Sequence, residues 1–239
     1  LGSQEAATSL RQALGDSSDR LSVDEMAFSA ELMAYAAHKM QACQQLRRAL
    51  AGLAAHPRDS EVVLNDGIAT LRALDADVGV DDLSHAHEHS LEVQVPFLQY
   101  LFGELPILPI AVGHTTRDAV LALGMALATL CAAHDLLLIA STDFSHQVPA
   151  EVARERDALA LDRIRAVDPL GLLAVVAARD ISMCGSLPTA IALVAAKAMG
   201  VEDGAVLHYH TSGDVTGDTR QVVGYGAVAL QKRQRSKRS

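Results

Sequence analysis

Apolar and polar positions follow two different patterns in successive parts of the chain. From Gln4 to about Leu53, apolar residues recur three and four positions apart, which is the spacing of amphipathic helices. After residue 58, short continuous apolar runs alternate with helical patterns. We therefore expect a helical N-terminal segment (1–58), an α/β domain (59–231) and a basic disordered tail (232–239).

The apolar runs after residue 58 predict buried strands at 61–64, 105–113, 135–146, 204–210 and 220–231. Helical spacing predicts helices at 69–76, 116–134, 150–167, 168–178 and 187–200. Strands that alternate with helices of this length are typical of an open sheet covered on both faces. The expected fold class is therefore α/β, a three-layer αβα sandwich with a mixed, mostly parallel sheet.

Composition narrows the class of protein. The chain has 239 residues, of which 50% are hydrophobic, so it can bury a large core. No run approaches the length of about 18 apolar residues that a membrane span needs, and no basic-then-apolar leader is visible at the start. Three scattered cysteines suit a reducing compartment. We expect a cytoplasmic protein without a membrane partner.

The charge distribution argues against nucleic acid as a partner. The formal net charge is −9, although the last nine residues, "QKRQRSKRS", carry five positive charges and no negative ones. Phosphate binding needs a concentrated basic face, which the acidic body of the chain does not offer. The tail is more typical of a solvated end, with binding of an acidic partner as the alternative. The expected partner is a small molecule or another protein, whose identity the sequence does not give.

The loop "STDFSH" follows the apolar run "LLLIA" and contains Asp143 and His146. Ligands gather where loops leave the carboxyl ends of strands in open α/β sheets. A carboxylate and an imidazole three residues apart could act there as acid, base or metal ligand. In the structural alternative, Asp143 and Ser145 bind the amides of a loop or a helix start. The residues alone leave both interpretations open.

The stretch "MCGSLPTAIAL" places Cys184 and Gly185 directly before a predicted helix, in which Pro188 suits the first turn. The amides and the dipole of a helix start favour the thiolate, so Cys184 is a candidate nucleophile or soft metal ligand. An inert buried thiol is the alternative. Cys43 and Cys131 lie inside helical patterns, and we expect them to be packed thiols.

A histidine-rich stretch, "HAHEHSLEVQVPFLQ" (85–99), stands ahead of an apolar run. A strand would align His85, His87 and His89 on one side, whereas a helix would align His85, His89 and Glu92. These are different sites, and a solvent-facing cluster is the alternative for the first two histidines.

We predict a loop over 85–88 and a helix from about Ser90, with Pro96 restricted to a first turn or an edge position.

Further along, His208 and His210 alternate in a predicted strand. They face one way and could pair, although simple packing is the plainer interpretation.

Two common chemistries have no motif in the sequence. The stretch "TSGDVTGD" contains neither the GxxxxGK phosphate loop nor a GxGxxG that opens a helix. No GxSxG elbow is present either. Nucleotide binding and serine hydrolysis therefore lose support.

Five ordered blocks resemble the Memo-like family, and within it the AmmeMemoRadiSam system protein B group: "EHSLEVQVPFLQ", "ILPIAVG", "IASTDFSH", "CGSLPTAIAL" and "YHTSGDVTGDTRQVVGYGAVAL". The resemblance extends from about Asp59 to Gln231. It implies a fold similar to that of the class III extradiol dioxygenases, which use non-haem iron. It also implies a metal-dependent redox enzyme associated with iron or copper, without a settled reaction.

The resemblance assigns roles to four residues. Cys184 stands where the family has a cysteine metal ligand. His146 matches a histidine that resembles the dioxygenase general base, with Asp143 beside it. His89 matches a histidine of the pocket, so that these four side chains are the expected site.

The sequence departs from the family where two further histidine ligands are expected. Family members begin with a strand that ends in a "PHAGY"-like motif and another that ends in "GPSH"-like residues, and neither motif is present. One cysteine does not hold a divalent metal tightly against water. The chain is then either an N-terminally truncated form or a diverged, non-catalytic binding or scaffold protein that has lost the metal. A thiol-dependent hydrolase using Cys184 and His146 is a third hypothesis.

Overall fold

The structure, a computed structural model, describes residues 67–69, 71–72, 78–80, 83–86, 88–103, 107–134 and 136–232. Several predicted features lie outside these residues: the helical segment 1–58, Cys43, the strand at 61–64, His87 and the tail beyond Lys232. The predicted domain boundaries therefore stay predictions.

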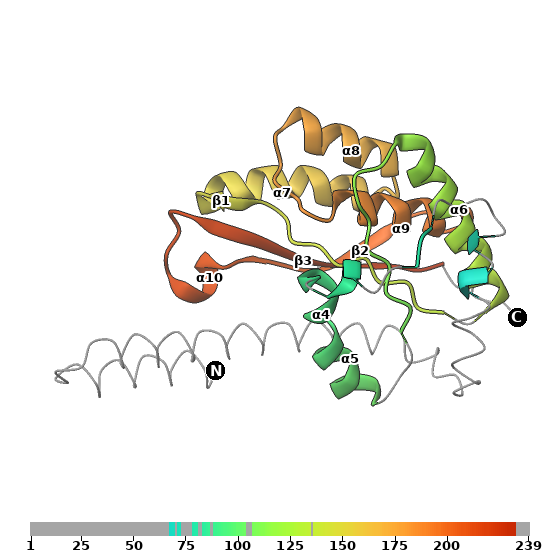
Figure 1. Ribbon diagram of the computed structural model, residues 1–239. Coiled ribbons are helices and arrows are strands. Elements are labelled where there is room, and N and C mark those ends of the chain that lie inside the picture. Colours follow the sequence, from blue (N-terminus) through green and yellow to red (C-terminus); the bar gives the residue numbers. More distant parts are fainter. Residues whose placement is uncertain are drawn as a thin grey trace, which may run out of the picture.

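The described elements follow one another in the order shown in Figure 1: η1 (Leu83–His85, a 3-10 helix), α4 (His89–Glu92), α5 (Val95–Phe102), α6 (Arg117–Ala133), β1 (His146–Val148), α7 (Ala150–Arg165), α8 (Pro169–Ala178), α9 (Ser186–Ala198), β2 (Gly204–Thr211), α10 (Gly213–Thr216) and β3 (Val222–Leu230). Helices α6 to α9 and strands β2 and β3 lie within about two residues of their predicted bounds. The α/β class is confirmed.

The described sheet is antiparallel, with the strand order β1-β3-β2. The prediction of a mostly parallel sheet is wrong for these strands. Between β2 and β3 the chain forms only the single-turn helix α10 and a short loop. Such a connection returns the chain alongside itself, whereas parallel neighbours need a longer crossover. The three-layer sandwich stays a prediction.

Two apolar runs that were predicted as strands have no regular secondary structure over 107–113 and 136–145, and only His146–Val148 forms strand β1. Their side chains nevertheless alternate between more exposed and less exposed positions over 107–113 and 137–140. Leu138 packs on a buried cluster, while its neighbours Leu137 and Ile139 are 45% and 39% exposed. An apolar run specifies burial, but it does not specify a hydrogen-bonding partner.

Helix α7 covers one face of the sheet and contacts all three strands. Its buried positions recur at helical spacing: Ala150, Ala153, Asp157, Ala160, Leu161 and Ile164. In Figure 1, α8 and α9 lie on the same side of the β2–β3 ribbon as α7, and neighbouring helices of this layer contact each other. This arrangement places the start of α9 beside the loop that leads into β1.

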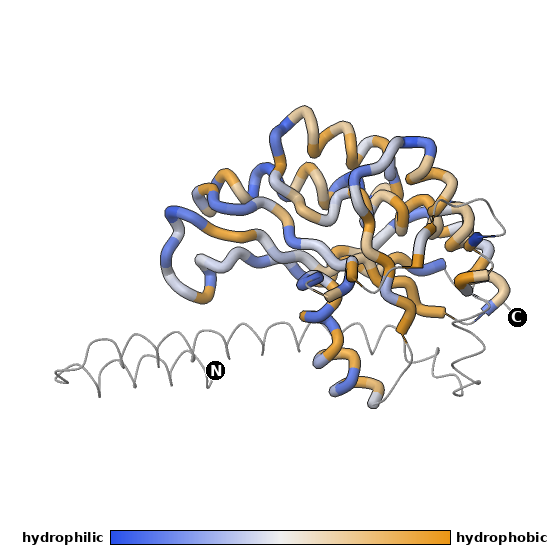
Figure 2. Tube along the Cα trace, viewed as in Figure 1, coloured by the Kyte–Doolittle hydropathy of each residue, from blue (hydrophilic) through white to orange (hydrophobic). Residues whose placement is uncertain are grey.

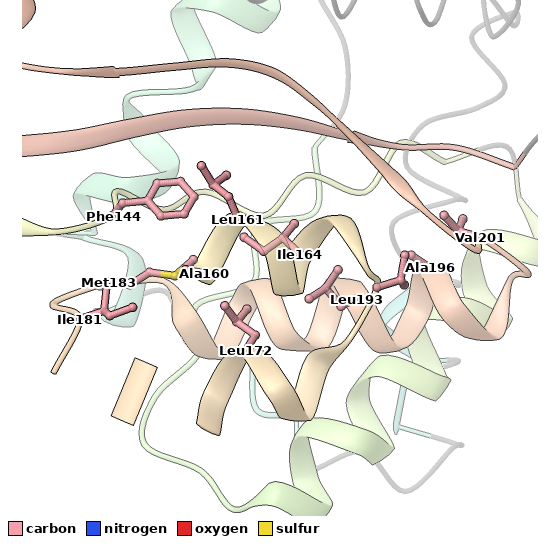
Figure 3. Packing of buried hydrophobic residues seen from close by; sticks show 11 residues of the cluster. Phe144, Ala160, Leu161, Ile164, Leu172, Ile181, Met183, Leu193, Ala196 and Val201 are labelled. Atoms are coloured by element: carbon pink, nitrogen blue, oxygen red, sulfur yellow. The ribbon is translucent and has the colours of Figure 1, made fainter. Parts of the chain in front are cut away.

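The first core cluster joins this helical layer to the sheet and comprises Phe144, Ala160, Leu161, Ile164, Val167, Leu172, Ile181, Met183, Leu193, Ala196 and Val201. Figure 3 shows its members from α7, α8 and α9 converging, together with the loop residues Phe144 and Met183. Phe144 directly follows Asp143, and Met183 directly precedes Cys184. The core therefore anchors the backbone next to two candidate site residues.

The second core cluster lies between α6 and α9 and comprises Leu71, Val120, Ala126, Leu127, Ala128, Leu130, Ala190, Ile191 and Ala195. Gly124 allows the two helices to approach closely, because a Cβ added there would lie 2.5 Å from Val194 Cβ.

Figure 2 shows the apolar character of α6, α8 and α9 and the polar character of the loop between α10 and β3. None of the helices in the described ranges is long and apolar enough to cross a membrane.

Candidate functional site

The loop over residues 141–146, called the hub loop below, contacts each of the other segments that carry a predicted site residue. Ser141 Oγ donates a hydrogen bond to Ser90 O over 2.7 Å and accepts one from Gln94 Nε2 over 2.8 Å. Thr142 Oγ1 accepts a hydrogen bond from Gly185 N–H over 2.9 Å. The hub loop thus joins α4 and the start of α9, although they are far apart in sequence.

His146 is fixed by Ser182, which precedes Cys184 by two residues. The His146 backbone N–H donates to Ser182 Oγ over 2.7 Å, and His146 Nδ1 lies 2.7 Å from Ser182 O. A carbonyl oxygen can only accept a hydrogen bond, so this partner assigns the proton to Nδ1. In the neutral ring, Nε2 then carries the lone pair that can accept a proton.

Asp143 faces the other nitrogen of the same ring. Its Oδ2 lies 3.8 Å from His146 Nε2, and the two side chains are 41% and 32% exposed. Among the described residues the Asp143 carboxylate accepts no backbone amide, so it does not cap a loop or a helix there. The pair forms a half-exposed acid–base arrangement at the surface of the hub loop.

Cys184 lies directly before α9, as predicted, and is exposed. The alternative of a buried thiol is therefore wrong for this residue. Its Sγ lies 3.9 Å from Thr142 Oγ1 and 4.0 Å from Asp143 O. A Cβ on Gly185 would lie 2.5 Å from Thr142 Cβ, so glycine allows this turn to rest on the hub loop. No contact joins Cys184 to the His146 ring within the described part of the chain.

His89 is the first residue of α4, close to the helix start predicted at Ser90. Glu88 caps this helix by accepting hydrogen bonds from Ser90 N over 2.9 Å and Leu91 N over 2.7 Å. Partial burial alone would raise the pKa of the Glu88 carboxyl, but a hydrogen bond from Ser90 Oγ, together with these two amide bonds, holds that pKa below its ordinary value. The cap gives the short helix a defined start.

The His89 side chain does not join the acid–base pair. It is 82% exposed, and its Nδ1 lies 3.9 Å from Glu92 Oε2. The structure brings α4 to the hub loop, but in the described contacts the His89 ring faces Glu92 rather than His146 or Cys184. His85 lies in η1.

The donors do not form a metal-binding set by themselves. Over the described ranges, no group of three or more His, Cys, Asp or Glu side chains is arranged to hold a metal ion. A tightly bound iron or copper needs several converging ligands. Cys184, His146 and Asp143 therefore do not fit a metal without donors from elsewhere.

The structure also tests the predictions made for the two histidines of β2 and for Cys131. The rings of His208 and His210 pair on β2, with their centroids 4.1 Å apart. Cys131 lies in α6 and is partly buried, and this burial raises the pKa of its thiol.

Sequence reasoning missed two residues beneath the hub loop, Asp157 and Tyr209. Asp157 is fully buried and accepts hydrogen bonds from Ser145 and Tyr209. One signal was available, because Asp157 occupies a position on the otherwise apolar face of α7. A lone carboxylate on such a face indicates a buried partner.

Comparison with known proteins supports the resemblance seen in the sequence. Residues 62–229 match the model of the Memo-like protein family. The chain belongs to the Memo-like family. A MEMO1 family protein of Methanopyrus kandleri is 41% identical over 175 residues, which are 72% of this chain and 62% of that protein.

Two further relatives give the same result. A MEMO1 family protein of Methanosarcina acetivorans is 39% identical over 176 residues, which are 72% of this chain and 64% of the relative. A MEMO1 family protein of Sulfolobus acidocaldarius is 39% identical over 172 residues, which are 70% of this chain and 60% of the relative. The matched part of this Memo-like chain thus spans 60 to 64% of the length of these relatives.

Proposed function

We propose that this Memo-like protein is an enzyme in which His146 transfers a proton to or from a small molecule bound over the hub loop. The observation that carries the proposal is the double contact of the His146 ring, with Ser182 O at Nδ1 and Asp143 at Nε2. A ring held at one nitrogen presents the other in a fixed direction, which general acid–base catalysis requires.

Each residue has a defined part in the proton transfer. Nε2 of His146 takes a proton from an acidic O–H or N–H of the bound molecule, and the ring becomes an imidazolium. The Asp143 carboxylate, 3.8 Å from Nε2, stabilises that positive charge. Ser182 O keeps its hydrogen bond to Nδ1 in both states, so the ring need not turn during the transfer.

We further propose that the reaction is a redox reaction of the dioxygenase type that depends on iron or copper. Cys184 is the residue of the described site that would hold the metal, which would supply the redox chemistry. The described donors do not complete a metal site, so this part of the proposal requires further ligands. The acid–base role of His146 does not depend on it.

The experiment loads the protein anaerobically with Fe(II) and then measures oxygen consumption with catechol as a probe substrate. We expect stoichiometric iron in the wild type and in His146→Gln, and no stoichiometric iron in Cys184→Ala. We also expect His146→Gln to slow oxygen consumption by at least about a hundredfold, the lower end of the usual contribution of a general base. His134→Gln, which changes a histidine at the end of α6, is the matched control and should behave as the wild type.

Two results would contradict parts of this proposal separately. A wild-type protein that binds neither iron nor copper would exclude the metal-dependent reaction. An unchanged rate in His146→Gln with bound iron would exclude the base role.

A second candidate function is a non-catalytic binding or scaffold protein that keeps the fold without the metal. It is favoured by the lack of three converging donors within the described ranges. A protein that binds a ligand only in its folded state is stabilised by that ligand. The scaffold function therefore predicts an unchanged melting temperature when Fe(II) or Cu(II) is added, and a large rise would exclude it.

A further inference from the structure

Asp157 is a fully buried carboxylate to which the mechanism above gives no part. Its Oδ1 accepts hydrogen bonds from Ser145 N over 3.0 Å and from Ser145 Oγ over 2.6 Å. Its Oδ2 accepts a hydrogen bond from Tyr209 OH over 2.7 Å. An unpaired buried carboxylate would be strongly unfavourable, and these three donors satisfy it. Two of them come from the residue directly before His146.

Strand β3 holds the same part of the hub loop from the other side. Phe144 N–H donates to Gly224 O, and Gly224 N–H donates to Ser145 O, each over 2.9 Å. Ser145 therefore has its N–H, its carbonyl and its hydroxyl all bound. Strand β3 binds only the carbonyl of Ser145, and Asp157 binds its N–H and its hydroxyl.

Gly224 also provides the space for the carboxylate. A Cβ added to Gly224 would lie 2.0 Å from Asp157 Oδ2 and 3.1 Å from Tyr209 OH. A side chain at this position would displace the carboxylate or the tyrosine. The Asp157 contact thus depends on a glycine of another element as well as on Asp157 itself.

Tyr209 completes the network from β2. Burial and the hydrogen bond to Asp157 together raise the pKa of its hydroxyl, so this group stays a hydrogen-bond donor at neutral pH. Its ring meets Phe144 edge to face, with centroids 6.3 Å apart. Tyr209 satisfies Oδ2 and does not contact Ser145 through its hydroxyl, which allows the two halves of the network to be tested separately.

We infer that Asp157 is a positioning residue, which fixes Ser145 and thereby keeps the His146 ring on Ser182 O with Nε2 directed toward Asp143. The inference rests on the proposed role of His146, because the direction of Nε2 matters only if that nitrogen transfers protons. Asp157 itself does not contact the His146 ring, and it is not exposed at the surface of the hub loop.

The test uses the full chain labelled with ¹⁵N, without metal or substrate, and His146 is assigned from the His146→Gln spectrum. NMR reports the ring tautomer of His146 and the hydrogen-exchange protection of the Ser145 amide. In the wild type we expect one tautomer, protonated at Nδ1. In Asp157→Ala, which removes the acceptor of both Ser145 bonds, and in Gly224→Ala we expect a mixture of tautomers and a loss of Ser145 protection of about tenfold or more.

Three comparisons make the result specific. Ser145→Ala keeps the amide bond to Asp157 and loses the hydroxyl bond, so the loss of protection at its residue-145 amide should be smaller than that in Asp157→Ala. Tyr209→Phe keeps both bonds of Ser145 and should leave the His146 tautomer unchanged. Gly113→Ala is the control for the glycine variant, because a Cβ there meets nothing within 4 Å. The Leu193 amide in α9 should keep wild-type protection in every variant.

The inference is overturned if folded Asp157→Ala or Gly224→Ala keeps the wild-type tautomer of His146 or full protection of the Ser145 amide. A uniform loss of protection that includes Leu193 would also overturn it, because Asp157 would then support the whole fold rather than the hub loop. These measurements need no activity, so a failure to bind iron affects the proposed function alone.

Discussion

At the residue scale, single carboxylates connect elements that the apolar pattern leaves unrelated. Besides Asp157, Asp214 in α10 accepts hydrogen bonds from Thr211 N and Thr211 Oγ1 and forms an ion pair with Arg154 of α7. Partial burial alone would raise the pKa of the Asp214 carboxyl, but the Thr211 hydrogen bonds, with Arg154 and His210, hold it below its ordinary value of 3.8. The charged form is therefore the one that stabilises the folded state.

We predict that Asp214→Asn destabilises the protein at neutral pH and not in acid. A carboxyl with a lowered pKa contributes its full stability above its ordinary pKa and loses it as the pH falls through the folded value. The expected loss at pH 7 is about 1 kcal/mol, the usual net value of a hydrogen bond. Urea unfolding of both proteins at pH 7 and at progressively lower pH measures the difference.

The control is Asp162→Asn, which removes an exposed ion pair with Arg165. Its effect should be small at every pH, because exposed pairs contribute little. A difference between wild type and Asp214→Asn that grows as the pH falls would contradict the prediction.

At the element scale, the two apolar runs outside regular secondary structure keep an alternating burial pattern over 107–113 and 137–140. Leu108, Ile110, Val112 and Leu138 pack on the second core cluster, whereas Ile107, Leu137 and Ile139 are exposed. Alternation of this kind places successive side chains on opposite faces of a segment. The inward-facing side chains pack each run against the second core cluster, to which α6 and α9 contribute.

We predict that Leu138→Ala destabilises the protein by about 1–2 kcal/mol, because it removes packed atoms from the second core cluster. The adjacent Leu137→Ala, at a position 45% exposed, should change the free energy of unfolding by less than about 0.5 kcal/mol. Denaturant unfolding of the two variants measures both values. Equal losses would show that the two faces of the run are equally buried.

At the scale of the whole molecule, α9 joins the two core clusters. It contributes Leu193 and Ala196 to the first cluster and Ala190, Ile191 and Ala195 to the second. A rigid helix that is packed on both sides couples the stability of the two regions, because neither cluster can be lost without exposing one side of α9.

We predict that the described α/β part unfolds in one cooperative transition. Leu172→Ala, in the first cluster, and Leu127→Ala, in the second, should each lower the free energy of unfolding by about 2–5 kcal/mol and shift the same transition. Circular dichroism and tyrosine fluorescence, followed together during unfolding, provide the measurement. Separate transitions in either variant would show that the clusters unfold independently.

The sequence by itself determined the helices α6 to α9, strands β2 and β3, the position of Cys184 at a helix start and the family of the protein. These features depend on the order and spacing of nearby residues, which a linear pattern contains. The same alternation along one strand predicted that His208 and His210 face one way, whereas their ring contact was the less favoured of the two interpretations.

Only the tertiary structure decided the antiparallel pairing, the outward direction of His89 and the connections made by the hub loop. The partner of a strand or a polar side chain depends on which surfaces meet after packing, and neighbours such as Ser145 and Asp157, or Thr142 and Gly185, are separated along the chain. Asp157 illustrates the limit: its place on an apolar face indicated a buried partner, but the fold alone determined that this partner is the residue before His146.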